Sequence, residues 1–470
     1  VQVGPTSIPQ TWDWCSGYHA SDSTVIGFSH THLSGTGIGD LFDVTVMPVT
    51  GDVTYARGTE DDPTSGLWSY ADRTQEIARP GYYSVPLTRY GIRAELTATA
   101  RVGLHRYTFP ASEKAAVVFD LENGGCWDKA TETHLAKEGD RTVTGWRHST
   151  GWAKDQRVYF AAEFSKPFEK FETIGDNYAR ASFRTTDGEQ VSLKVALSPV
   201  SVEGAKANLA AELSGWDFEE TAAAADKAWN DELSKVKIET EDETSKRIFY
   251  TALYHTMVAP SLFCDVNGDY RGADGKVHEN PGRDTYTTFS LWDTYRAAMP
   301  LMTVLHPERM PDIIQTMLHI ADEQGRLPVW HLWGNETDCM VGNPGIVAVA
   351  DAIVKDIPGF DREKAFEAIR KTAMNPDRGN GLRMEYGYIP CEMFNEAVAY
   401  DMEYALADGA AARAAETLGK AEDAKYFEER SHSYRNYFDP QTGFMRGRDL
   451  KKGWRTPFNA FASTHRADDY

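Results

Sequence analysis

The sequence predicts a chain of two parts, an antiparallel β-sandwich followed by a helical toroid of which only a portion is present. Apolar residues recur with a period of two up to about residue 215, as in half-buried strands, and with a period near 3.6 beyond it, as in amphipathic helices. Turn-forming residues also divide the first part into many short segments. We therefore expect a sandwich domain over 1–215, a helical linker over 216–240 and a helical domain over 241–470.

Three segments carry the sandwich prediction. Segments 92–102 and 190–197 alternate apolar and polar residues, and segment 115–121 is apolar enough to be a buried strand. Gly-containing turns such as Asn123-Gly124 and Asp187-Gly188 lie between such segments. Many short strands joined by turns of this kind are typical of two stacked antiparallel sheets.

The helical part begins with an Ala-rich amphipathic stretch, 221–235, which we expect to form the linker helix. Six more stretches have helical periodicity, at 242–257, 307–322, 345–355, 361–374, 395–418 and 421–437. Gly419 separates the last two, as glycines that end helices do, so these two should form a helical hairpin. Successive hairpins favour an α/α toroid. A toroid of six hairpins needs twelve helices, so we expect the helical domain to continue past Tyr470.

Composition excludes several classes of partner. The chain has 49 Lys and Arg against 70 Asp and Glu, a net charge of -21, which disfavours binding to nucleic acid or to anionic membranes. No stretch reaches the roughly 18 apolar residues of a membrane span. The five Cys are odd in number and contain no C-x-x-C pair, so neither a zinc cage nor a disulfide framework is indicated. The 12 Trp and 22 Tyr are compatible with a carbohydrate protein and also with a large core.

Two loop segments combine carboxylates with aromatic side chains. Segment 289–296 places Asp293 between Trp292 and Arg296, and segment 327–337 contains Trp330 and Glu336. Such combinations suit glycoside chemistry, because carboxylates act around the anomeric carbon while indole rings exclude water. Asp293 and Glu336 are therefore the catalytic candidates that residue chemistry suggests. The alternative is a buried Asp293–Arg296 pair beside core tryptophans.

The sequence resembles glycoside hydrolase family 92, a family of α-mannosidases, over nearly its whole length. The matching motifs are CSGYH at 15–19, GFSHTHLSGTG at 27–37, WDT at 292–294 and GNET at 334–337. The resemblance implies an (α/α)6 barrel after the sandwich and exo-acting, inverting release of mannose from α-mannosides such as N-glycans or mannan. It also implies dependence on Ca²⁺ and an extracytoplasmic location.

Individual residues carry over where they stand in a matching motif. The resemblance implies that Trp12 walls the mannose subsite and that Asp293 holds the sugar, and Glu336 is expected to line the pocket in a role not assigned. The residues expected to bind substrate are Trp12, Trp292, Asp293, Arg296, Trp330 and Glu336.

The resemblance places the general acid in a motif expected after Tyr470, and the general base further on. No family catalytic residue is therefore assigned within the chain, and its Ca²⁺ ligands are not assigned. Pro344 departs from the family pattern, in which His is common, and Pro cannot donate a hydrogen bond. Two other functions stay open: a non-catalytic carbohydrate-binding protein, and another sandwich-plus-toroid enzyme such as a disaccharide phosphorylase. Phosphorolysis would require a basic phosphate site, and the loops show no Arg or Lys cluster.

Overall fold

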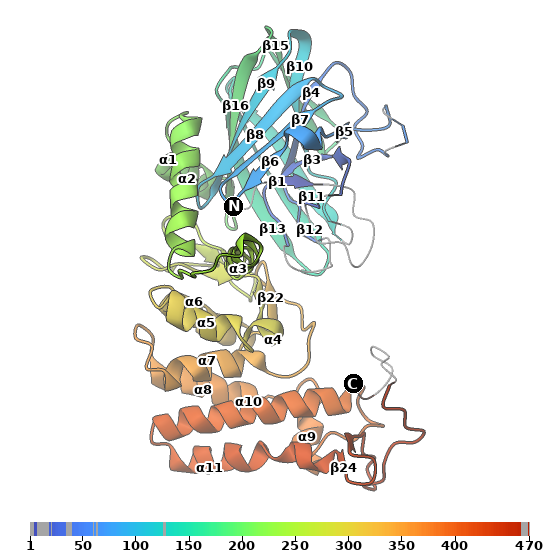
Figure 1. Ribbon diagram of the computed structural model, residues 1–470, viewed down its shortest axis with the longest axis vertical. Helices are drawn as coiled ribbons and strands as arrows, with labels where there is room; N and C mark the ends of the chain where they lie inside the picture. Colours follow the sequence, from blue (N-terminus) through green and yellow to red (C-terminus); the bar gives the residue numbers. More distant parts are fainter. Residues whose placement is uncertain are drawn as a thin grey trace. The chain divides into compact units, whose positions relative to one another are not determined.

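The computed structural model describes residues 4–6, 18–19, 21–33, 40–59, 61–62, 64–125, 128–461 and 469. By density of contacts the chain divides into two compact units (Figure 1). The β unit comprises Val1–Arg271 with Val277–Thr287, and the helical unit comprises Gly272–Lys276 with Thr288–Tyr470. The domain ranges expected from the sequence mark where the apolar period changes from that of strands to that of helices. The two units are defined by contacts instead, so the predicted ranges stay a prediction.

Two large antiparallel sheets form the main body of the β unit, whose described residues also form three small two-stranded sheets. The six-stranded sheet has the order β1-β3-β4-β10-β15-β14, formed by Gly4–Thr6, Gly27–Ser29, Thr45–Thr50, Ser112–Asp120, Tyr178–Thr185 and Lys170–Ile174. The eight-stranded sheet has the order β11-β12-β13-β16-β9-β8-β7-β6, formed by Lys129–Glu138, Thr142–Thr150, Gln156–Phe164, Glu189–Ser198, Val102–Phe109, Ile92–Ala98, Tyr82–Leu87 and Ile77–Arg79.

Aromatic side chains fill the space between the two sheets. Phe119 of β10 stacks on Phe160 of β13 with ring centroids 6.0 Å apart, and Phe109 of β9 meets Phe183 of β15 at 6.5 Å. Both pairs join strands of different sheets, and all four rings are buried. The prediction of an antiparallel sandwich is therefore confirmed.

One predicted strand is two strands. The structure confirms strands at 115–121 and 190–197, as β10 and β16, but segment 92–102 divides into β8 and the start of β9. The Thr99 amide donates to the Val102 carbonyl at 2.8 Å, which closes a tight turn between them. Because the alternation of apolar and polar residues continues through this turn, periodicity alone predicted one strand.

Three helices belong to the β unit: α1 (Val202–Glu212), α2 (Phe218–Leu233) and α3 (Glu243–His255). The predicted linker helix is α2, which starts earlier than expected because Asp217 caps it, accepting from the Glu220 amide. Helix α1 lies in the range predicted as sandwich and packs on β13 and β16. Its buried residues include a polar one, Asn208, whose side-chain amide donates to Asp265 at 2.8 Å.

The helical unit contains α4 (Leu291–Thr294), α5 (Ala298–Leu305), α6 (Met310–Gln324), α7 (Pro344–Val354), α8 (Arg362–Ala373), α9 (Asn380–Tyr386), α10 (Ala397–Thr417) and α11 (Ala421–Arg430). Helices α10 and α11 pack together as the predicted hairpin, and Gly419 between them has a positive φ of 73°. The prediction of one helix over 421–437 was wrong, because α11 ends at Arg430 and a separate 3-10 turn follows. Helices α4, α5 and α9 are too short for periodicity to detect.

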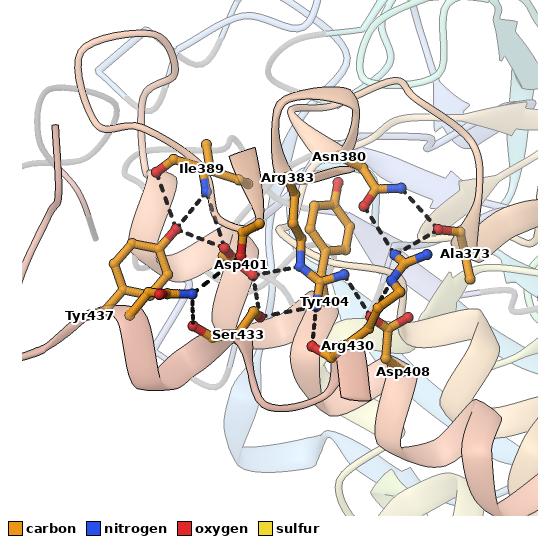
Figure 2. A network of polar contacts seen from close by, with 12 residues as sticks. Ala373, Asn380, Arg383, Ile389, Asp401, Tyr404, Asp408, Arg430, Ser433 and Tyr437 are labelled. Carbon is orange, nitrogen blue, oxygen red and sulfur yellow. Dashed lines mark hydrogen bonds and ion pairs between the residues drawn. The ribbon is translucent and has the colours of Figure 1, made fainter. Parts of the chain in front are cut away.

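A buried ion network joins α9, α10 and α11 (Figure 2). Arg383 of α9 contacts Asp401 and Asp408 of α10, at 2.6 Å each, and their side chains are at most 3% exposed. Arg430 of α11 contacts Asp408 at 3.1 Å. The Tyr437 hydroxyl donates to Asp401 at 2.8 Å. Two cations therefore balance two anions inside the protein.

A second buried cluster, in the β unit, is not balanced. Arg147 of β12 contacts Asp43 at 2.7 Å and Asp128 at 2.5 Å, and all three side chains are almost fully buried. Asp40 is also buried, and one of its oxygens has no hydrogen-bond partner. Burial raises the pKa of Asp40 to about 6 and that of Asp128 to about 7. Removal of these carboxylates from water thus opposes their ionisation.

The first prediction concerns the ion network. Asp401→Ala should destabilise the protein by about 3–5 kcal/mol, because it leaves Arg383 buried with one partner fewer. Urea unfolding followed by circular dichroism measures this loss. The control is Glu416→Ala on the same helix, whose ion pair with Arg413 is exposed and should contribute at most about 1 kcal/mol. Equal effects of the two substitutions would contradict the prediction.

The second prediction concerns pH. An acid whose pKa is raised in the folded state binds more protons there than when unfolded, so the contribution of Asp40 and Asp128 to stability should fall as pH rises from about 4 to 7. Asp40→Asn should reduce that fall by roughly 1–3 kcal/mol, since the amide never ionises. Thermal unfolding at pH 4.5 and 8 compares the variant with wild type. Asp187→Asn, in an exposed turn, is the control and should leave the pH dependence unchanged.

Candidate active site

A small sheet in the helical unit brings together the two loop segments that the sequence singled out. Strands β21 (Phe289–Ser290), β22 (Trp330–Leu332) and β23 (Asn335–Glu336) form a three-stranded antiparallel sheet. Ser290 pairs with Trp330, and His331 pairs with Glu336. Residues about 40 positions apart in the chain therefore become neighbours, and α4 begins directly after β21.

Asp293 lies in α4 with its side chain exposed. The Ser290 hydroxyl donates to one carboxylate oxygen at 2.5 Å, which fixes the orientation of the group. A carboxylate that is held and still reaches solvent can accept hydrogen bonds from ligand hydroxyls.

Arg296 does not form the buried pair with Asp293 that was the alternative interpretation. Its ion pair is with Glu403 of α10, at 2.7 Å, and the Arg296 side chain is 44% exposed. The guanidinium lies over the Trp292 indole, 4.4 Å from the ring centroid. Trp292 is half-buried, so the pair forms a mixed aromatic and cationic wall next to Asp293.

The Glu336 carboxylate is engaged by the backbone. Its oxygens accept from the amides of Val329 at 2.8 Å, Trp330 at 2.9 Å and Asp338 at 3.0 Å. Three hydrogen bonds from amides hold the loop around β22 and β23 in one shape. This geometry favours a role for Glu336 in positioning the loop over direct proton transfer.

The remaining predicted residues fall in different places. Trp330 is only 2% exposed and lies in the core of the helical unit. Trp12 lies outside the described residues. Pro344 is the first residue of α7, where its missing N–H is tolerated.

Glu403 is the site residue that sequence analysis missed. One of its oxygens accepts from Arg296, and the other accepts from the Tyr295 hydroxyl at 2.8 Å. Burial and the neighbouring carboxylate raise the pKa of Tyr295, so the phenol stays protonated and donates. The sequence does place Glu403 inside the Ala-rich helix predicted at 395–418, where an acid stands out. Helical periodicity, however, does not show that this acid pairs with Arg296.

The histidine motif of the β unit has a structural role where it is described. His30 is fully buried and lies 2.6 Å from the Val44 carbonyl and 2.8 Å from Nε2 of His105. Burial lowers the pKa of His30 to about 3, so it is neutral at physiological pH. The motif's residues 34–37 lie outside the described part.

Calcium is coordinated by several oxygen atoms, most often from carboxylates and carbonyls. Taken unit by unit, the described residues bring no three carboxylate, imidazole or thiolate groups within 4.8 Å of one another. No calcium ligands are therefore assigned within either unit. Among the same described residues, none of the helices has the length and apolar character needed to cross a lipid bilayer.

Family models match almost the entire chain. The model described as the glycosyl hydrolase family 92 N-terminal domain matches residues 1–198, and that of the family 92 catalytic domain matches residues 204–470. Among curated proteins, an uncharacterized secreted glycosidase of Arthroderma benhamiae is 27% identical, with 92% of this chain and 58% of that protein covered.

Solved structures agree with the family models. A family 92 α-mannosidase of Bacteroides thetaiotaomicron in complex with mannoimidazole has a TM-score of 0.93 and 38% identity, with 97% of this chain and 63% of that one covered. An inverting mannosidase of the family from Bacteroides thetaiotaomicron VPI-5482 has a TM-score of 0.86 and 29% identity, with 97% and 63% covered. The chain thus spans about three fifths of the length of these relatives.

Proposed function

Because the chain belongs to glycoside hydrolase family 92, we propose that it is part of an exo-acting α-mannosidase, which releases mannose from α-mannosides such as N-glycan or mannan chains. The observation that carries this proposal is the held but exposed carboxylate of Asp293, beside the Trp292–Arg296 wall. Two similar structures are of mannosidases, one of them with mannoimidazole bound.

The proposed roles follow from the contacts. Asp293 accepts hydrogen bonds from sugar hydroxyls, Arg296 donates to them, and the Trp292 indole excludes water from one side. Trp12 is proposed as a further wall on the resemblance alone. Glu336 acts indirectly, by holding the loop that contains Trp330.

The reaction is proposed to invert the anomeric centre. A general acid would protonate the leaving oxygen while a general base activates water on the opposite face, with the two carboxyls roughly 6.5–9.5 Å apart to admit the water. No residue described above is assigned to either role. Their hydrogen bonds suit Asp293 to binding the sugar and Glu336 to positioning the loop.

The cellular location is proposed to be extracytoplasmic. The Arthroderma benhamiae relative is described as secreted. Polymeric α-mannosides such as mannan are substrates outside the cytoplasm, which is consistent with this location.

Calcium dependence is also proposed from the family resemblance, and no step is assigned to the ion. Dialysis of the intact protein against a calcium chelator should lower mannose release at least about tenfold, and added Ca²⁺ should restore it. Measurement of free mannose before and after dialysis tests this. Full activity in excess chelator would refute the requirement.

Asp293→Asn should weaken transition-state stabilisation by about 2–4 kcal/mol, and so lower kcat/KM for an α-mannoside, because a charged hydrogen-bond acceptor is lost. The melting temperature should stay nearly unchanged, because Asp293 is exposed and Arg296 keeps its partner Glu403. A lower melting temperature with unchanged kcat/KM would instead assign Asp293 a structural role.

The same assay separates the proposed function from the alternatives. A non-catalytic carbohydrate-binding protein would bind mannosides and release no mannose. A phosphorylase would require inorganic phosphate and release a sugar phosphate. Mannose release in phosphate-free buffer would exclude both.

A further inference from the structure

We propose that Glu403 is a positioning residue of the active site, which holds Arg296 over Trp292 and so preserves the sugar-binding wall beside Asp293. This inference rests on the proposed function. Glu403 itself is not expected to touch substrate, because its oxygens already accept from Arg296 at 2.7 Å and from Tyr295 at 2.8 Å. Its effect is therefore transmitted through these two residues.

The first argument is that Arg296 is held at three points. Nη2 contacts Glu403, Nε donates to the Trp292 carbonyl at 3.1 Å, and the guanidinium plane covers the Trp292 indole at 4.4 Å. An exposed arginine otherwise samples many rotamers, which costs free energy when a ligand orders it. Glu403 removes that cost in advance, and it leaves other N–H groups of Arg296 for hydroxyl oxygens of a sugar.

The second argument is that the loop at Gly342 packs directly against Glu403, which restricts where its side chain can lie. A Cβ atom on Gly342 would lie 2.4 Å from Cβ of Glu403, and Gly342 has a φ of 79°. Only glycine satisfies both conditions without strain. Arg378 also holds this loop, since its Nη1 donates to the Gly342 carbonyl at 2.8 Å.

The third argument is the chemistry of the Tyr295 contact. Tyr295 is 7% exposed and immediately precedes Arg296, so its hydroxyl fixes the second Glu403 oxygen from the protein interior. The carboxylate is thereby oriented with one oxygen toward the interior and one toward Arg296, whose side chain is exposed. A carboxylate with a single partner would leave Arg296 free to rotate about that bond.

A double-mutant cycle in the intact protein tests the inference. Glu403→Gln keeps the size of the side chain and removes the charge that pairs with Arg296. It should raise KM for an α-mannoside and lower kcat/KM about tenfold or more. In the Arg296→Ala background, the same substitution should cause no further loss, because Glu403 acts through Arg296. A merely structural role would give independent losses that multiply.

Two further variants keep the test decisive. Glu416→Gln, in an exposed ion pair on the same helix, should leave kcat/KM unchanged. If Glu403→Gln does not fold, Tyr295→Phe replaces it: loss of one donor to Glu403 should lower kcat/KM by a smaller factor, again with no effect in the Arg296→Ala background.

The outcomes separate the two proposals. Wild-type protein that releases no mannose from any α-mannoside would contradict the proposed function. Active wild-type protein with an unchanged kcat/KM in Glu403→Gln, or with losses that multiply in the double variant, would contradict only the positioning role. A fall in kcat/KM that vanishes without Arg296 would support it.

Discussion

The helical unit depends on the buried ion network that Arg383 makes with Asp401 and Asp408. A charge buried without a partner costs several kcal/mol, so α9, α10 and α11 can exclude water only in the arrangement that pairs each charge. Asp401 and Glu403 are two residues apart on α10, which places them about 200° apart around the helix. The face that the network holds in place therefore directs the opposite face toward Arg296. In this way a structural network on one face of α10 helps to position a wall of the candidate site on the opposite face.

The β unit handles buried charge differently. Arg147 faces Asp43 and Asp128, with Asp40 close by, so the carboxylates outnumber the cation. Because the pKa values of Asp40 and Asp128 are raised, these two acids bind protons at a mildly acidic pH, which lowers the excess negative charge there. Burial disfavours the charged form of histidine as well. It therefore lowers the pKa values of His30 and His105 and keeps both side chains neutral. The buried polar groups of the β unit therefore make its stability depend on pH, as proton binding requires of acids whose pKa is raised by burial.

The candidate site uses hydrogen bonds to give similar carboxylates different roles. Asp293 receives one bond from Ser290 and remains exposed, which suits contact with a ligand. Glu336 accepts hydrogen bonds from three backbone amides and holds the loop around β22 and β23 in place. Glu403 accepts hydrogen bonds from Arg296 and from the Tyr295 hydroxyl, and it holds the Arg296 side chain in place. Residue type alone could not separate these roles, because all three are carboxylates beside aromatic residues.

The amino-acid sequence by itself determined the local features: the change from strand to helix periodicity, the longer helices, the hairpin at Gly419, and motifs that identify family 92. These features depend on residues close together in the chain. Only the tertiary structure decided that β21 pairs with β22, and that Arg296 binds Glu403, 107 positions away, instead of Asp293. It also decided that Trp330 is buried and that segment 92–102 contains a turn. The physical reason is that hydrophobic periodicity identifies which face of an element is buried, whereas the partner of a charge depends on which elements pack together.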